Sequence, residues 1–141
     1  MKKVFIDTNI FIDYIENREG AGFAQNIFNL AAKGKIVLYA STLTFANMAY
    51  VIKKKRTREE VLNILDHFEQ CVEVLSMDKQ QLRNAIDQPC KDFEDMLQYQ
   101  CAVAGNCEMF VTNNMKDYQE FCELPLLSSR GFLLSYFREI E

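Results

Sequence analysis

The run V-F-I-D-T-N-I-F-I-D at residues 4–13 constrains the fold more than any other part of this chain. Its β-branched and aromatic residues predict a buried strand over residues 3–6, and an acid, a hydroxyl and an amide follow at once. Asp7 is therefore predicted to lie at the carboxyl end of a strand, which is where open α/β sheets bind ligands. Alternatively, Asp7, Thr8 or Asn9 only caps the helix that begins there.

Composition and length indicate one globular domain over residues 1–141. The chain is 49% hydrophobic and 26% charged, and a chain of this length can bury a substantial core. No apolar run reaches the roughly eighteen residues of a membrane span, and acids interrupt the segment where a signal peptide would be apolar. We therefore expect a cytoplasmic protein with no membrane contact. The net charge of −4 means that any surface for nucleic acid must be local.

Short apolar runs alternate with helical patterns along the chain. The predicted strands are residues 3–6, 36–39, 71–75, 109–111 and 126–127. Four predicted helices are residues 8–15, 23–33, 92–104 and 129–137. Three more are recognised by their caps: one begins at Ser41 or Thr42 and ends in the basic run 53–56, one begins with a capping box of Thr57 and Glu60, and one begins at Ser76 or Asp78 and runs to residue 87. This alternation predicts a parallel sheet with helices on both faces.

Aspartates recur at the expected carboxyl edge of this sheet. Asp92 and Asp95 share one face at the start of a predicted helix. A helix cap and the helix dipole are enough to explain that pair. Asp7 after the first strand and Asp117 after the fourth exceed what caps require. Clustered carboxylates raise one another's pKa unless a cation offsets their charge, so the four together indicate a metal site.

Such a cluster favours a hard divalent cation. The five cysteines form no C-x-x-C pair and only one histidine is present, so neither a zinc site nor a disulfide framework is expected. Oxygen ligands alone select Mg²⁺ or Mn²⁺. An ion of this kind activates water and neutralises charge at a phosphodiester, so the residues point to phosphoryl transfer or hydrolysis.

A basic run and three tyrosines have two interpretations each. The run consists of Lys53, Lys54, Lys55 and Arg56. It forms either an RNA phosphate-contacting patch or a helix end whose charges complement the helix dipole. Tyr14, Tyr50 and Tyr99 either stack on bases or belong to the core. The sequence is compatible with either interpretation in each case.

Three segments resemble the PIN domain family, which includes the VapC-like toxins of toxin–antitoxin pairs. They are V-F-I-D-T-N-I-F-I-D-Y-I at residues 4–15, D-F-E-D-M-L-Q-Y-Q-C-A at residues 92–102 and F-V-T-N-N-M-K-D-Y at residues 110–118, in the order and spacing typical of the family. The resemblance implies a three-layer α/β/α fold with a central, mainly parallel five-stranded sheet. It also implies a Mg²⁺- or Mn²⁺-dependent ribonuclease site.

The resemblance assigns this site residue by residue. Asp7 matches the first acidic ligand of the family and Asp95 the third, and Asp92 matches a supporting acid of some relatives. Asp117 lies one turn beyond the usual fourth acid and is predicted to substitute for it. The catalytic carboxylates are then Asp7, Asp95 and Asp117, and Asp92 is a further metal ligand. The residues predicted to line the site are Thr8, Asn9, Asn47, Thr112 and Asn114.

Two amides stand where the family usually has acids. Asn47 occupies the position of the second acid, in the segment S-T-L-T-F-A-N at residues 41–47, and Asn114 occupies that of the fourth. An amide oxygen can bind a metal, but it adds no charge and cannot act as a base. Lower metal affinity is therefore expected.

The main hypothesis is a metal-dependent endoribonuclease that hydrolyses RNA phosphodiester bonds. The family resemblance implies that its products carry 5′-phosphates. In this hypothesis it is the toxin of a toxin–antitoxin pair, with an antitoxin protein as partner. The alternative is a catalytically silent PIN-like module that binds RNA or a protein, which the two amides favour and the retained aspartates oppose. A nuclease for structured DNA has less support, because no inserted arch for a branched duplex is present. Apolar residues of the second and third predicted helices also allow a homodimer.

Overall fold

Five parallel strands form the centre of the molecule. The structure is a computed structural model that describes residues 1–139. Its strands are β1 (Lys2–Ile6), β2 (Ile36–Ser41), β3 (Glu73–Leu75), β4 (Met109–Val111) and β5 (Leu126–Leu127), in the order β3-β2-β1-β4-β5. Every pairing is parallel. The prediction of a mainly parallel five-stranded sheet is thus confirmed, and the strands are in fact all parallel.

Helices follow the strands as the sequence patterns indicate. They are α1 (Thr8–Ile15), α2 (Ala21–Ala32), α3 (Thr42–Ile52), α4 (Arg58–Cys71), α5 (Lys79–Asp87), α6 (Phe93–Ala104) and α7 (Ser129–Glu139), with 3₁₀ turns η1 (Lys53–Lys55) and η2 (Met115–Asp117). Both hydrogen bonds of the predicted Thr57 and Glu60 capping box form. Within residues 1–139, none of these helices combines the length and apolar character that crossing a membrane requires.

Several boundaries differ from the prediction by one or two residues; β2, for example, ends at Ser41 rather than at residue 39. Two of these differences have clear local causes. The helix α2 begins at Ala21 rather than at residue 23, because Gly20 adopts a left-handed φ of 94° that turns the chain directly into the helix. The third strand is shorter than residues 71–75, because α4 continues to Cys71 and Val72 is the first residue with an extended backbone. Neither difference changes the order of the elements.

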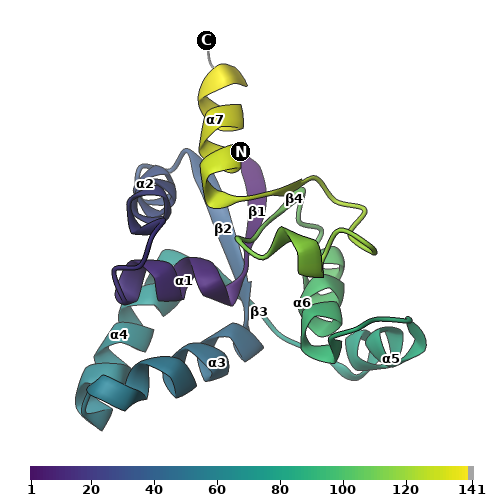
Figure 1. Cartoon of the computed structure of the whole chain (residues 1–141), viewed down its shortest axis with the longest axis horizontal. Helices are drawn as coiled ribbons and strands as arrows, with labels where there is room; N and C mark the ends of the chain where they lie inside the picture. Colours follow the sequence, from purple (N-terminus) through teal and green to yellow (C-terminus); the bar gives the residue numbers. More distant parts are fainter. Residues whose placement is uncertain (140–141) are drawn as a thin grey trace.

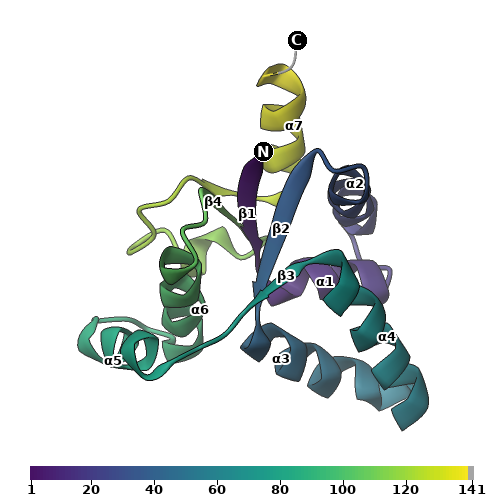
Figure 2. The same ribbon diagram turned by 180° about the vertical axis from the view of Figure 1, so that it is seen from behind.

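Alternate residues of the strands pack on opposite faces of the sheet. Val4 and Ile6 belong to a core that includes Phe11 of α1, whereas Phe5 stacks on Phe110 at 5.0 Å between ring centroids in a second core that includes residues of α5 and α6. Figure 1 shows α1, α2 and α4 on one side of the strands and α5 and α6 on the other, and Figure 2 shows the same layers from behind. The three-layer α/β/α arrangement is therefore confirmed.

The strand order brings three strand ends together. β1 lies between β2 and β4, and Ile6 pairs with Val111. The backbone N–H of Asp7 donates to the carbonyl of Val111 at 3.0 Å, so Asp7 and Thr112 leave the sheet side by side. Because all strands are parallel, the residues that follow β1, β2 and β4 meet at one edge.

Candidate active site

Asp7 is a buried carboxylate held by three donors. It is 7% exposed and caps α1. Its Oδ1 accepts a hydrogen bond from the backbone N–H of Thr8 at 2.8 Å, and its Oδ2 accepts from Thr112 Oγ1 at 2.8 Å and from Asn9 Nδ2 at 3.2 Å. Burial raises the pKa of Asp7, and the bonds from Thr112 and Thr8 offset part of that rise. Asp7 is thus both a helix cap and a rigidly oriented carboxylate.

The segment after β4 is bonded to the start of α1. Thr112 Oγ1 accepts from Asn9 Nδ2 and from the backbone N–H of Asn114, both at 3.1 Å. Asn9 Oδ1 in turn accepts from the backbone N–H of Asn113 at 3.2 Å. These bonds hold the predicted residues Asn9, Thr112 and Asn114 around Asp7.

Asp95 lies in the first turn of α6, close to other acids. Its Oδ1 accepts from the hydroxyl of the fully buried Tyr118 at 3.1 Å, and its backbone N–H donates to Asp92 at 3.1 Å. Burial and the charge of Asp92 raise the pKa of Asp95 to about 7, and Asp7 and Asp117 add to the rise while the bond from Tyr118 opposes it. A carboxylate in this position is unsatisfied electrostatically, and a bound cation would lower its pKa.

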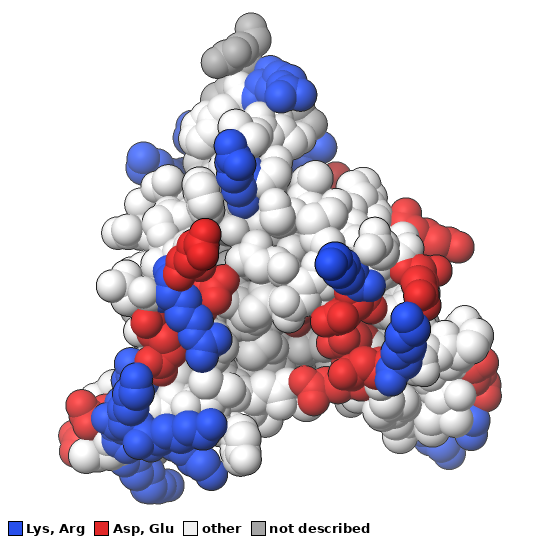
Figure 3. All heavy atoms as spheres, in the orientation of Figure 1, with Lys and Arg blue, Asp and Glu red and all other residues white. Residues whose placement is uncertain are grey.

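Asp7 and Asp95 line one open pocket with a volume of about 340 Å³. Thr8, Asn9, Asn47 and Asn114 line it as well, as the sequence analysis predicted for the site. In Figure 3 the Asp and Glu side chains gather beside α6, right of the centre. Arg18, from the turn between α1 and α2, is the only Lys or Arg side chain that lines this pocket within residues 1–139. No role of Arg18 was predicted from the sequence.

Glu94 is a second pocket residue that the sequence analysis missed. Asn47 Nδ2 donates to Glu94 Oε1 at 2.5 Å, which joins α3 to the start of α6. A carboxylate therefore lies beside Asn47, the amide predicted to occupy the position of the second acid. The available signal was the position of Glu94 directly before Asp95, but its partner is 47 residues away in sequence.

Asp92 and Asp117 line a neighbouring hollow instead. This smaller cavity, of about 170 Å³, also contains Lys91 and Lys116. Asp92 is the N-cap of α6 and Asp117 closes the turn η2. The structure therefore does not bring these two predicted metal ligands into the pocket with Asp7, although both charges act on Asp95. A direct role for them in metal binding stays a prediction.

The donor set of the pocket fits a hard divalent cation. Among the residues that the structure describes, no three His, Cys, Asp or Glu side chains are grouped closely enough to enclose an ion by themselves. Mg²⁺ is usually held by one or two carboxylates together with several waters. Asp7 and Asp95 supply such carboxylates, and burial together with the neighbouring charges of Asp92, Asp7 and Asp117 raises the pKa of Asp95.

The predicted basic patch is divided between two environments. Arg56 forms an ion pair with Glu16 at 2.8 Å and donates to the carbonyl of Ile52, so its guanidinium is engaged within the fold. Lys53, by contrast, lies over the ring of Tyr50, 4.7 Å from the ring centroid. Figure 3 shows the Lys and Arg side chains of this region gathered at the lower left, over the end of α3 and the start of α4.

The three tyrosines also differ in how far their side chains are exposed. Tyr14 packs against Phe28 and Phe68 in the core, and Tyr99 is only 8% exposed. Tyr50 is 63% exposed. Of the three, only Tyr50 offers an aromatic face to a ligand.

A network of buried polar side chains lies next to the pocket. Gln98 is 1% exposed; its Nε2 donates to Thr44 Oγ1 at 2.9 Å, and its Oε1 accepts from Ser41 Oγ at 2.5 Å. Thr44 Oγ1 lies 3.0 Å from Thr8 Oγ1, next to Asp7. The network thus joins the ends of β1 and β2 to α6.

Replacing Gln98 with Leu should destabilise the protein by about 2–3 kcal/mol, because the buried hydroxyls of Ser41 and Thr44 each lose one hydrogen-bond partner. Urea unfolding followed by circular dichroism measures the change. The exposed Gln80→Leu substitution on α5 is the matched control and should stay within about 0.5 kcal/mol of the parent. Equal effects of the two substitutions would contradict the structural role of the network.

Fold and pocket together define a three-layer α/β protein with a carboxylate site at the carboxyl edge of its parallel sheet. A sequence profile described as PIN domain matches residues 3–116. The chain belongs to the PIN domain family. The family resemblance noted in the sequence is thus confirmed.

Individual relatives agree with this assignment. Ribonuclease VapC1 of Aquifex aeolicus is 29% identical over 143 aligned positions, which cover 86% of this chain and 94% of the relative. The fold is similar to VapBC2 from Rickettsia felis, solved with a promoter DNA fragment, with a TM-score of 0.69, 23% identity and coverage of 89% of this chain and 98% of that one. VapC20 of Mycobacterium tuberculosis, a sarcin-ricin loop cleaving toxin, has a TM-score of 0.59, 12% identity and coverage of 76% and 86%.

Proposed function

We propose that this protein is a metal-dependent endoribonuclease that hydrolyses RNA phosphodiester bonds. The observation that carries the proposal is the pocket shared by Asp7 and Asp95, in which burial and neighbouring acids raise the pKa of Asp95 to about 7. Membership of the PIN domain family and a relative named as a ribonuclease support it. Clustered carboxylates of this kind are the usual protein ligands of a cation that serves phosphoryl transfer.

In this proposal Asp7 and Asp95 hold Mg²⁺ or Mn²⁺, and Asn47 and Asn114 offer neutral oxygens. Asp92 and Asp117 act from the neighbouring hollow, through their charge on Asp95. When bound, the cation supplies Lewis-acid chemistry and neutralises charge at the phosphodiester. The hydrogen bonds from Thr112, Asn9 and Thr8 keep the carboxylate of Asp7 in one orientation. The hydroxyl of Tyr118 does the same for Asp95.

The hydrolytic step needs an acceptor for the proton of the attacking water. We assign this role to Glu94, because Asn47 cannot act as a base and its amide holds Glu94 Oε1. The water oxygen forms a bond to phosphorus as the bond to O3′ breaks, which leaves a 5′-phosphate and a 3′-hydroxyl that takes its proton from solvent. Arg18 supplies positive charge for the non-bridging oxygens of the phosphate.

We further propose that the protein is the toxin of a toxin–antitoxin pair. Relatives solved as VapBC complexes support an antitoxin partner. A small gene directly upstream, whose product binds this chain and stops its cleavage of RNA, is the expected observation. A homodimer remains a separate prediction, which sedimentation of the purified protein tests.

The activity should depend on added metal. A pool of single-stranded and structured RNAs incubated with the protein in Mg²⁺ or Mn²⁺ should yield fragments with 5′-phosphates, and EDTA should abolish their formation. The exposed Asp66→Asn substitution on α4 serves as a control for loss of one surface charge and should cleave normally. If the folded protein cleaves no RNA in either ion, the alternative of a catalytically silent module with two amides in its site takes precedence.

A further inference from the structure

We infer that Tyr50, Lys53 and Lys54 form a subsite for a nucleotide beside the scissile phosphate, and that the RNA bound there is single-stranded. This inference rests on the proposed function, because it takes the carboxylate pocket as the place of cleavage. It concerns the outer surface of α3, which runs from that pocket towards the basic turn η1.

One face of α3 is continuous with the pocket. Asn47, Tyr50 and Val51 have the spacing of neighbours on one side of a helix, and all three line the carboxylate pocket. Tyr50 also lines a second cavity of about 490 Å³ between α3 and α4. Tyr50 therefore lies where the two cavities meet. An RNA strand that extends from the carboxylate pocket along α3 would contact Tyr50 first.

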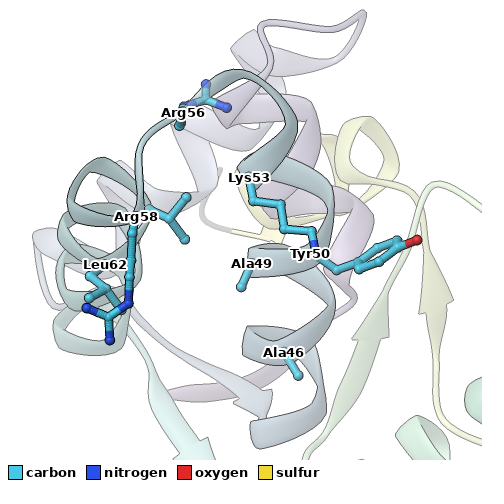
Figure 4. A pocket seen from close by; sticks show the side chains of 8 residues that line it. Ala46, Ala49, Tyr50, Lys53, Arg56, Arg58 and Leu62 are labelled. Carbon is cyan, nitrogen blue, oxygen red and sulfur yellow. The ribbon is translucent and has the colours of Figure 1, made fainter.

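The lysines that follow Tyr50 concentrate positive charge at its ring. Lys53 Nζ and Lys54 Nζ lie 4.7 and 5.9 Å from the centroid of Tyr50. Figure 4 shows Tyr50 extending from α3 away from α4, with Lys53 one turn further along the chain. Neither lysine forms an ion pair within the described part of the chain, whereas Arg56 is paired with Glu16. The two ammonium groups are thus available to an anionic ligand.

This combination matches the chemistry of a single RNA strand. An exposed aromatic face binds an unstacked base whatever its identity, and adjacent lysines bind the phosphates on either side of it. In a duplex the bases are stacked inside and cannot reach the ring. Tyr50 lines the carboxylate pocket and also belongs to the outer face of α3. An RNA strand whose scissile phosphate lies in the pocket would contact both of these surfaces, whereas an acidic protein segment would not have to enter the pocket. RNA is therefore the favoured occupant of this face.

Fluorescence anisotropy with a labelled single-stranded RNA of roughly 12 nucleotides tests the inference. Binding is measured in Mg²⁺ in the Asp95→Asn background, where cleavage is at least about a hundredfold slower, and with the parent protein in EDTA, which abolishes cleavage of the probe. Tyr50→Ala should weaken binding about tenfold, whereas Tyr50→Phe should retain it within about twofold. Lys54→Gln should weaken binding and reduce the slope of log affinity against log salt concentration by about 0.7.

Control variants test whether loss of any exposed aromatic ring or any exposed lysine weakens RNA binding. Phe137→Ala removes another exposed aromatic ring, on α7, and Lys33→Gln removes another exposed lysine, after α2; both should bind single-stranded RNA like the parent. A duplex of the same sequence should bind more weakly than the single strand, with no dependence on Tyr50.

Two results would overturn the inference. One is unchanged affinity of Tyr50→Ala for single-stranded RNA; the other is no binding of RNA by any form of the protein, which would leave this face to a protein partner. If RNA binds through Tyr50 and Lys54 but the parent protein never cleaves it, the single-strand binding surface stands, whereas the proposed nuclease function fails and with it the position of this surface beside a scissile phosphate.

Discussion

Replacing Asp95 with Asn should reduce metal-dependent cleavage at least about a hundredfold and at the same time stabilise the protein in the absence of metal. Activity falls because one of the two buried or half-buried pocket carboxylates is lost. Stability rises because Asn removes a charge that burial, Asp92 and Asp7 disfavour. Cleavage rates and thermal unfolding in EDTA measure the two effects.

The stability gain should depend on pH. Folding raises the pKa of Asp95 from 3.8 to about 7, so the folded state binds its proton more tightly than the unfolded state does. The favourable contribution of this proton is complete below about pH 4 and is lost as the pH rises through about 7. Because Asp95 is partly exposed, solvent screening limits the cost of its charge to about 1–2 kcal/mol. The Asn variant should therefore gain most above pH 7 and nothing near pH 4.

Metal and a matched control complete this test. Mn²⁺ should raise the unfolding temperature of the parent protein and have little effect on the Asp95→Asn variant, because the ion binds only the folded state. The exposed Asp66→Asn substitution should show neither the pH-dependent gain nor the loss of the metal effect. An Asp95→Asn protein that is less stable than the parent at pH 8 would contradict the electrostatic account of the pocket.

The second large effect is expected from exchanging Asn47 and Glu94. Glu94→Gln alone should lower cleavage by about 10–100-fold, because no carboxylate remains at this side of the pocket. The double substitution Asn47→Glu with Glu94→Gln should restore most of the activity, since it keeps one carboxylate, one amide and the contact between α3 and α6. Rates with a defined RNA, and Mn²⁺ affinity by calorimetry, give the coupling between the two positions.

The double substitution is interpreted by comparison with its two single substitutions, Asn47→Glu and Glu94→Gln. Asn47→Glu alone places two carboxylates at a position where the parent has a hydrogen bond of 2.5 Å, so it should lower the unfolding temperature without metal. A Glu94→Gln protein that cleaves RNA at the parent rate would remove Glu94 from the catalytic pocket. Loss of activity in the double variant, with its fold intact, would show that the two positions are not equivalent.

Much of the fold was predictable because it depends on neighbours in the sequence. The bounds of α1 and β4 and the capping box of Thr57 and Glu60 agree with the prediction. Caps and strand runs are decided by residues within a few positions of one another. The assignment of Asp7 to the carboxyl end of a buried strand followed from the same local pattern, and alternation of strands and helices was enough for the parallel, three-layer architecture.

The make-up of the pocket was predictable only in part. Asp7 and Asp95 meet as expected, but Asp92 and Asp117 line a different hollow. Spacing in the sequence showed that these acids lie near one sheet edge, but not which side of α6 each one faces. The direction of a side chain on α6 or η2 depends on how that element packs in the fold. A shift of one residue along the element turns a carboxylate away from the pocket.

The sequence by itself determined the order of the elements, the parallel sheet and a carboxylate at the end of its first strand, since these follow from local patterns of apolar and polar residues. Tertiary structure alone decided that Glu94 meets Asn47 and that Tyr50 rather than Tyr14 or Tyr99 is exposed. The physical reason is that such contacts depend on how α3 and α6 pack around a strand order that places β1 between β2 and β4. No pattern within one element encodes that packing.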